Sequence, residues 1–153
     1  MRRYEKWKIA QDKSYDSLID ALLASRDLVR SDLEVGHESL HDPMLLRDMD
    51  RAVSRITRAV RSSEMILVFG DYDVDGVSST ALMADFLKNL GCKFTCVLPD
   101  RRKDGYGLRS ESVEDAASLG TDLIITVDNG ISAFDGLESA NNLGIDVVVT
   151  DHH

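Results

Sequence analysis

Short apolar runs alternate with longer amphipathic segments in the second half of the chain. The runs are rich in Val and Ile, as is typical of strands buried on both faces of a sheet, and they span residues 65–69, 94–98, 123–127 and 145–149. The segments between them have helical spacing and end beside a glycine, a common helix stop, and they span residues 76–90, 111–119 and 133–143. This alternation predicts an α/β fold, a parallel sheet of about four strands with flanking helices.

The first part of the chain shows helical spacing without such runs. Ser14 can cap a first helix, and Asp42 followed by Pro43 indicates the start of a second one. An apolar stripe continues from Pro43 through Arg61. The pattern therefore predicts a helical N-terminal segment over residues 1–62 that precedes an α/β core over residues 63–153.

Composition limits the class of protein. Hydrophobic residues make up 43% and charged residues 29% of the 153 residues, which fits one globular domain. No apolar run approaches the ~20 residues that span a bilayer, and Met1–Ala10 lacks the apolar stretch of a secretory signal. We therefore expect a cytoplasmic protein with no membrane partner. Cys92 and Cys96 are expected to be reduced thiols, because ~13 Å separates two such positions on a strand.

The distribution of charge leaves the binding partner open. The net charge is −9, from 18 basic and 27 acidic residues, which argues against non-specific binding of nucleic acid. The loop after the second predicted strand is an exception, since it carries Arg101 and Arg102 close to Tyr106. Arginines beside a tyrosine could hold a phosphate backbone and stack a base. Exposed charge runs are, however, more often only solvated.

Carboxylates and imidazoles follow three of the four predicted strands. Asp71, Asp73 and Asp75 come after the first strand, Asp128 after the third, and Asp151–His153 after the fourth. Ligands of open parallel sheets bind at the carboxyl ends of the strands, near a switch in strand order. If the strand order is 2-1-3-4, these side chains converge at one edge of the sheet.

So many carboxylates in a small volume require a cation to offset their repulsion. Oxygen and imidazole ligands suit Mn²⁺ or Mg²⁺, with Zn²⁺ as an alternative. Two such ions about 3.5–4 Å apart would generate hydroxide and hold a phosphoryl group. Asp128, alone on its strand, is then the natural bridging ligand.

Each of these residues also has a structural interpretation. Acidic residues after strands are often turn formers or helix caps, and Asp128-Asn129-Gly130 in isolation is a turn signal. The run Asp71–Gly76 imitates a calcium-binding EF-hand loop, but Leu82 stands where that loop needs a bidentate Glu, so we reject this interpretation. A haloacid-dehalogenase-type phosphatase remains a rival, although it explains Asp128 and the terminal histidines only loosely.

The start of the helix after the first predicted strand is a candidate phosphate site. Ser78 and Ser79 lie in its first turn, where backbone N–H groups and hydroxyls could face a phosphate. Ordinary helix capping explains either hydroxyl equally well.

Three segments together resemble a known family. Residues 68–76, 126–130 and 149–153 resemble motifs one to three of the DHH phosphoesterase superfamily, and within it the RecJ-type single-strand-specific exonucleases. Two further segments are similar to that group, the loop through Gly105-Tyr106-Gly107-Leu108 and the segment Leu40-His41-Asp42-Pro43. The resemblance spans nearly the whole chain. It implies that the parent protein catalyses metal-dependent hydrolysis of phosphodiester bonds. The parent would be a 5′-to-3′ exonuclease that acts on single-stranded DNA in DNA repair and recombination.

The resemblance also implies a role for each motif residue. Asp73 and Asp75 would bind two metal positions, Asp128 would bridge them, and His152 would be a further ligand. Many superfamily members have a His at the position of Phe69, and Asp71 would fill that gap as an additional ligand.

The remaining motif residues would face the substrate. His153 would contact the scissile phosphate or help to protonate the leaving group, so that Asp128 and His153 are the candidate catalytic residues. Arg101 would meet nucleic-acid phosphate, as the family resemblance implies.

Two parts of the family's active site follow the third motif. A fourth-motif aspartate and a second domain of the DHHA1 type lie beyond the position at which this chain ends, His153. We therefore expect a fragment with an incomplete two-metal site, weakly active or inactive by itself.

Two other functions remain open from the sequence. A non-catalytic DNA-binding or scaffolding relative is one alternative, although its ligand set should be eroded and here it is intact. A small-molecule DHH phosphoesterase that acts on short oligonucleotides or cyclic dinucleotides is the other. Other DNA-repair or replication proteins are further candidate partners, and the sequence leaves the oligomeric state undetermined.

Overall fold

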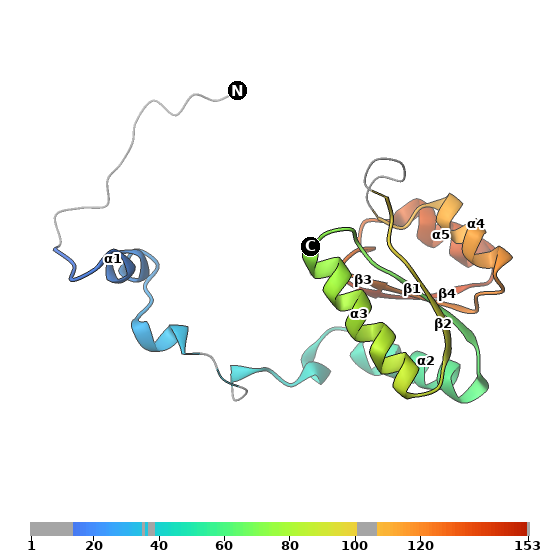
Figure 1. Cartoon of the computed structure of the whole chain (residues 1–153), viewed down its shortest axis with the longest axis horizontal. Coiled ribbons are helices and arrows are strands. Elements are labelled where there is room, and N and C mark those ends of the chain that lie inside the picture. The colour runs from blue at the N-terminus through green and yellow to red at the C-terminus, as the bar shows by residue number, and fades with distance from the viewer. Residues whose placement is uncertain (1–13, 35, 37–38, 101–106, 153) are drawn as a thin grey trace, which may run out of the picture. The chain divides into compact units, whose positions relative to one another are not determined.

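The computed structural model describes residues 14–34, 36, 39–100 and 107–152. The chain forms two compact units, Met1–Leu45 and Leu46–His153, and each is described by itself (Figure 1). The described elements are α1 (Leu18–Ala24), η1 (Arg30–Leu33), η3 (Pro43–Leu45), α2 (Met49–Ser62), β1 (Met65–Phe69), α3 (Val74–Asn89), β2 (Lys93–Val97), α4 (Ser110–Ser118), β3 (Leu123–Val127), α5 (Phe134–Asn142) and β4 (Asp146–Thr150).

The first unit is a small helical segment with little core of its own. Its helix α1 is capped by the hydroxyl of Ser17, which accepts a hydrogen bond from the backbone N–H of Asp20 at 3.2 Å. The prediction of Ser14 as the cap is therefore wrong by about one turn. Among the described residues of this unit, Leu23 is the one buried hydrophobic side chain.

The second predicted helix starts later than its Asp42-Pro43 signal indicated. The carboxylate of Asp42 accepts from the N–H of Met44 at 2.8 Å, and this contact makes a short 3₁₀ turn, η3, that stops after Leu45. Asp48 then has a φ of 55°, in the left-handed region, and the α-helix α2 begins only at Met49. The prediction of one helix from Pro43 through Arg61 is thus wrong before Met49, because the left-handed backbone at Asp48 separates the short turn η3 from α2.

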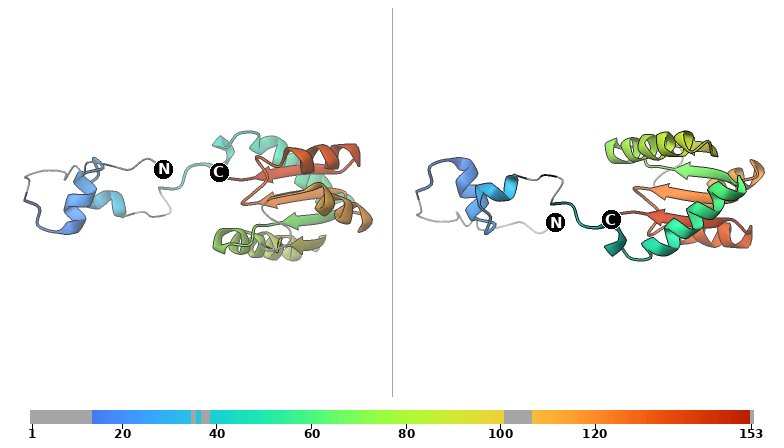
Figure 2. Two further views of the ribbon diagram at one scale, coloured as in Figure 1. Left: turned by 90° about the horizontal axis from the view of Figure 1, so that it is seen from above. Right: turned by 90° about the horizontal axis from the view of Figure 1, so that it is seen from below.

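The second unit contains a parallel sheet in the order β2-β1-β3-β4, which confirms the predicted fold class and strand order. All pairs are parallel, and the strand arrows visible in Figure 2 point to the same edge. The bounds of β1 and β3 match the predicted strands, and β2 and β4 are displaced from them by one residue. Strand β3 pairs with both β1 and β4, and all five of its residues are buried, so it is an interior strand as predicted.

Alternate strand residues enter two hydrophobic clusters on opposite faces of the sheet. On one face, Ile66 and Val68 of β1 pack with Ala59 of α2 and Leu87 of α3. On the other face, residues of β1 and β3 pack with α4 and α5, and this cluster contains Leu67, Phe69, Ile124, Val113, Ala116 and Ala140. The helices therefore cover both faces of the sheet, and the carboxyl ends of the strands stay open between them.

Two further expectations concern the helices and the thiols. No helix in the described part of the chain is long and apolar enough to cross a membrane. Cys92 and Cys96 are both free thiols; Cys92 packs against the first cluster, whereas Cys96 is exposed.

Candidate metal centre

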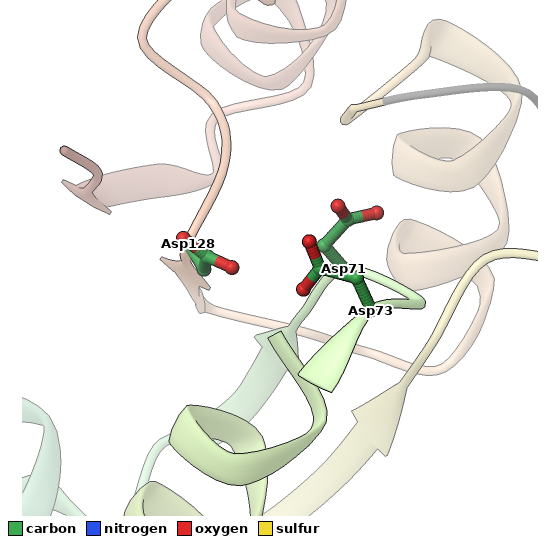
Figure 3. A group of neighbouring side chains, drawn as sticks. All are labelled: Asp71, Asp73 and Asp128. Carbon is green, nitrogen blue, oxygen red and sulfur yellow. The ribbon is translucent and has the colours of Figure 1, made fainter. Parts of the chain in front are cut away.

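Three aspartates from two neighbouring strands meet at the carboxyl edge of the sheet. Asp71 and Asp73 follow β1, and Asp128 follows β3 (Figure 3). One carboxylate oxygen of each residue lies within 4.8 Å of the others. Because β1 and β3 are adjacent and parallel, residues that follow them are delivered to the same place.

The connection from β1 to α3 places Asp71 in close contact with Gly76, in the first turn of the helix. A Cβ atom placed on Gly76 would lie 2.6 Å from the backbone nitrogen, Cα and Cβ of Asp71. Asp73 caps α3, since its Oδ1 accepts from the N–H of Gly76 at 3.0 Å. The positive end of the helix dipole therefore lies beside two of the three carboxylates, and it offsets part of their charge.

The backbone turns sharply at Asp128. This residue has a φ of 63°, in the left-handed region that Asp tolerates better than most residues, and Gly130 follows at 111°. The N–H of Asp128 donates to the carbonyl of Thr150 at 2.9 Å, so it bonds toward β4. This turn ends β3 at the site and places the Asp128 carboxylate in the group.

Two of the three aspartates are buried, and three of their four carboxylate oxygens lack hydrogen-bond donors among the described residues. The residues Asp71 and Asp128 are 3% and 7% exposed. Within the described part of the chain, no donor bonds Oδ1 of Asp71 or either oxygen of Asp128. The Nε2 atom of His152 lies 2.8 Å from Oδ1 of Asp128 but without the geometry of a hydrogen bond. Buried carboxylates of this kind need a positive partner, and a divalent cation fits the oxygen and imidazole donors present.

Other sequence-predicted site residues lie around this group or have local partners. Asp75 is exposed in the first turn of α3 and is not one of the three grouped carboxylates. Ser78 is exposed, and the hydroxyl of Ser79 donates to the carbonyl of Asp75 at 2.7 Å. Asp151, which follows β4, accepts from the N–H of Ile131 at 2.9 Å. The predicted residues Arg101, Arg102, Tyr106 and His153 lie outside the described residues.

The sequence pattern gave no role to Asn129 beyond a turn. Its side chain is fully buried, and its Nδ2 donates to the carbonyls of Phe69 and Val127 at 3.2 and 3.0 Å. A polar amide two residues after a strand that is buried on both faces is the signal that could have indicated such a role.

Comparison with known proteins places this arrangement in a family. The sequence profile of the DHH family, N-terminal domain, matches residues 65–153. The chain is 44% identical over 139 residues to the single-stranded-DNA-specific exonuclease RecJ of Escherichia coli, covering 89% of this chain and 24% of that protein. It is 38% identical over 141 residues to the RecJ of Bacillus subtilis, covering 89% of this chain and 18% of that protein. The chain thus spans about a fifth to a quarter of the length of these relatives.

Solved structures show the same likeness. A crystal structure of exonuclease RecJ bound to manganese is similar to this chain with a TM-score of 0.66 and 36% identity, over 71% of this chain and 28% of that one. A structure of RecJ in complex with Mn²⁺ from Thermus thermophilus is similar with a TM-score of 0.61 and 32% identity, over 71% of this chain and 15% of that one.

Proposed function

The chain belongs to the DHH family, and on this premise we propose that it forms the metal-binding part of an exonuclease that hydrolyses phosphodiester bonds in single-stranded DNA. The observation that carries the proposal is the pair of buried aspartates, Asp71 and Asp128, three of whose four carboxylate oxygens lack hydrogen-bond donors among the described residues. A folded protein keeps such groups where a cation binds. The relatives are single-stranded-DNA-specific exonucleases, and they supply the substrate class of the proposal.

The ligand set we propose extends the observed group. Asp71, Asp73 and Asp128 hold Mn²⁺ or Mg²⁺, and Asp75 and His152 complete a two-metal site. His152 supports this assignment because its imidazole already lies against Asp128. When bound, two divalent ions supply a hydroxide nucleophile and neutralise charge on the phosphoryl group.

The surrounding residues orient the substrate. The first turn of α3 directs backbone N–H groups to the same edge, and with Ser78 and Ser79 it can hold a phosphate. We assign Arg101 and Arg102 to the DNA backbone and Tyr106 to a stacked base, on their residue types and their place after β2. His153 donates the proton that the leaving oxygen requires. DNA repair and recombination, with other proteins of those processes as partners, is the corresponding cellular role.

The metal site can be tested by titrating this chain with Mn²⁺ and measuring free Mn²⁺ by electron paramagnetic resonance. Asp128→Asn keeps the shape of the side chain but removes its charge, and we expect Mn²⁺ affinity to fall at least about tenfold. The matched control is Asp135→Asn, an exposed aspartate in the first turn of α5. Equal Mn²⁺ binding by the wild-type chain and Asp128→Asn, both folded by circular dichroism, would refute the metal site.

The substrate is tested on a polypeptide in which residues 1–153 are joined to the part of a RecJ relative that lies outside the matched segment. With Mn²⁺ present, 5′-labelled single-stranded DNA should be degraded faster than the duplex of the same sequence. Degradation should stop in Asp128→Asn and persist in Asp135→Asn. Faster cleavage of dinucleotides than of longer single strands would indicate a small-molecule phosphoesterase instead. Binding of single-stranded DNA without cleavage would indicate a non-catalytic scaffold.

A further inference from the structure

Asn129 joins the ends of two strands at the point where both lead into the metal centre. The side chain is 0% exposed, and its Nδ2 group donates to the carbonyl of Phe69, the last residue of β1, and to that of Val127, the last residue of β3. The side-chain amide has two N–H donors, and two backbone acceptors face it. One amide therefore bridges the two strands that carry the grouped carboxylates.

The bridge lies where regular strand pairing stops. The last paired residues of β1 and β3 are Phe69 and Thr126. Beyond them, the N–H of Asp128 bonds toward Thr150 of β4, and β1 leads within two residues to Asp71. Among the described residues, the Asn129 amide is thus the polar side chain that ties the end of β1 to the end of β3 beyond their ladder.

The orientation of the amide follows from its surroundings. Both neighbours of Nδ2 are carbonyl oxygens, so the reverse orientation would set Oδ1 against two acceptors. The donor end is consequently fixed toward the strand ends. Removing it would leave two carbonyls at the strand ends without this donor and would free the strand ends to move apart.

We propose that Asn129 is a positioning residue of the metal centre, and that its amide sets the spacing between the carboxylates of Asp71 and Asp128. The inference rests on the proposed function, because these carboxylates are its metal ligands. Two buried like charges repel each other, and a rigid link between their strands resists that repulsion before a cation arrives. Groups behind metal ligands act in this way by holding the ligands in place.

Two substitutions separate positioning from folding. Asn129→Leu keeps a similar side-chain volume without a donor, and Asn129→Ala removes the side chain. The matched control is Asn142→Ala, an exposed asparagine at the end of α5. We expect both Asn129 variants to bind Mn²⁺ about 10–100-fold more weakly than the wild-type chain, at a temperature where far-ultraviolet circular dichroism shows them folded. The resonance line shape of the residual bound Mn²⁺ should also change.

The outcomes distinguish this inference from the proposed function. A wild-type chain that binds no Mn²⁺ would overturn the metal site itself. Mn²⁺ binding that is strong in the wild-type chain and unchanged in both folded Asn129 variants would overturn the positioning role alone. If one variant does not fold, the other decides. If neither folds, Asn129 is a folding residue and the positioning role is likewise overturned.

Discussion

At the scale of single residues, Gly76 is a position beside the metal centre where a side chain would not fit. Gly76 lies in the first turn of α3, and a Cβ atom there would approach three atoms of Asp71 to 2.6 Å. Two of these atoms belong to the backbone, so they cannot move aside as the end of a flexible side chain could. Glycine is required at this position by steric contact, and its absent side chain lets the helix reach the buried carboxylate.

Gly76→Ala tests this contact. We expect the substitution to lower the free energy of unfolding by about 1–3 kcal/mol, the usual cost of forcing an added methyl group into a packed site. Mn²⁺ affinity should fall as well, because the displaced backbone is that of Asp71. Urea unfolding measures the first effect and Mn²⁺ titration the second. Leu82→Ala, on the exposed side of the same helix, is the control. A variant as stable as the wild-type chain would show that the connection is loose.

At the scale of elements, one arginine links α2 to the amino ends of two strands, at the edge of the sheet opposite to the metal centre. Arg55 of α2 forms ion pairs with Glu64, just before β1, at 2.7 Å, and with Asp146, the first residue of β4. Burial lowers the pKa of Arg55, but hydrogen bonds to Asp146 and Glu64 outweigh that effect and raise it. The helix that covers one face of the sheet is thereby tied to both strands at their amino ends, away from the metal centre.

Arg55→Met should destabilise the second unit while leaving metal affinity unchanged. The side chain of Arg55 is only 14% exposed, whereas that of Asp146 is 54% exposed. We therefore expect a loss of about 1–3 kcal/mol in the free energy of unfolding, less than for a fully buried pair. The control Arg58→Met, whose side chain is 62% exposed and contacts the same Asp146, should lose less than about 1 kcal/mol. Equal losses in the two variants would contradict this assignment, and urea unfolding provides the measurement.

At the scale of the whole molecule, the two units are stabilised by different forces. The second unit has two hydrophobic clusters, one on each face of its sheet. The described part of the first unit has one buried hydrophobic residue, Leu23. An exposed ion pair joins Arg30 and Asp20, which are 2.7 Å apart. The first unit should therefore respond to pH on its own.

The pKa of Asp20 is lowered from 3.8 to about 2, mainly by its hydrogen bond to Arg30 and also by that to Ser17. A depressed carboxyl pKa contributes stability above the unfolded value, and this stability is lost as pH falls through the folded value. We thus expect the first unit to loosen as pH falls from about 4 to about 2. Carboxyl carbon shifts in nuclear magnetic resonance follow the titration of Asp20. In Arg30→Gln its pKa should return toward 3.8. An unchanged midpoint in that variant would show that Arg30 is not the cause.

Local patterns account for the parts of the fold and site that were predicted correctly. Strands buried on both faces must be apolar throughout, so the runs of β1 and β3 are visible in the sequence. Parallel strands with helical crossovers deliver the residues that follow them to one edge, so the meeting of Asp128 with the aspartates after β1 could also be expected. The DHH family and its fold were recognisable from the same motifs.

Other features depend on backbone contacts that the apolar pattern does not reveal. The spacing in sequence did not distinguish Asp71, which is buried in the group, from Asp75, which is exposed outside it. Their difference arises from the closeness of Gly76 to Asp71 and from the direction of the first turn of α3. The cap of α1 at Ser17 likewise depends on a local hydrogen bond, and α2 begins only after Asp48, whose backbone is left-handed.

By itself, the sequence determined the α/β class and the positions of the acidic residues after the strands, because apolar periodicity and chain connectivity leave little choice; the order 2-1-3-4, on which their meeting depends, entered as a condition that the structure confirmed. The tertiary structure alone decided which carboxylates are buried together and gave Asn129 its place between the ends of β1 and β3. The physical reason is that burial and hydrogen-bond partners are set by residues far away in the chain. Phe69 and Asn129 are 60 positions apart and become neighbours only when the sheet has formed.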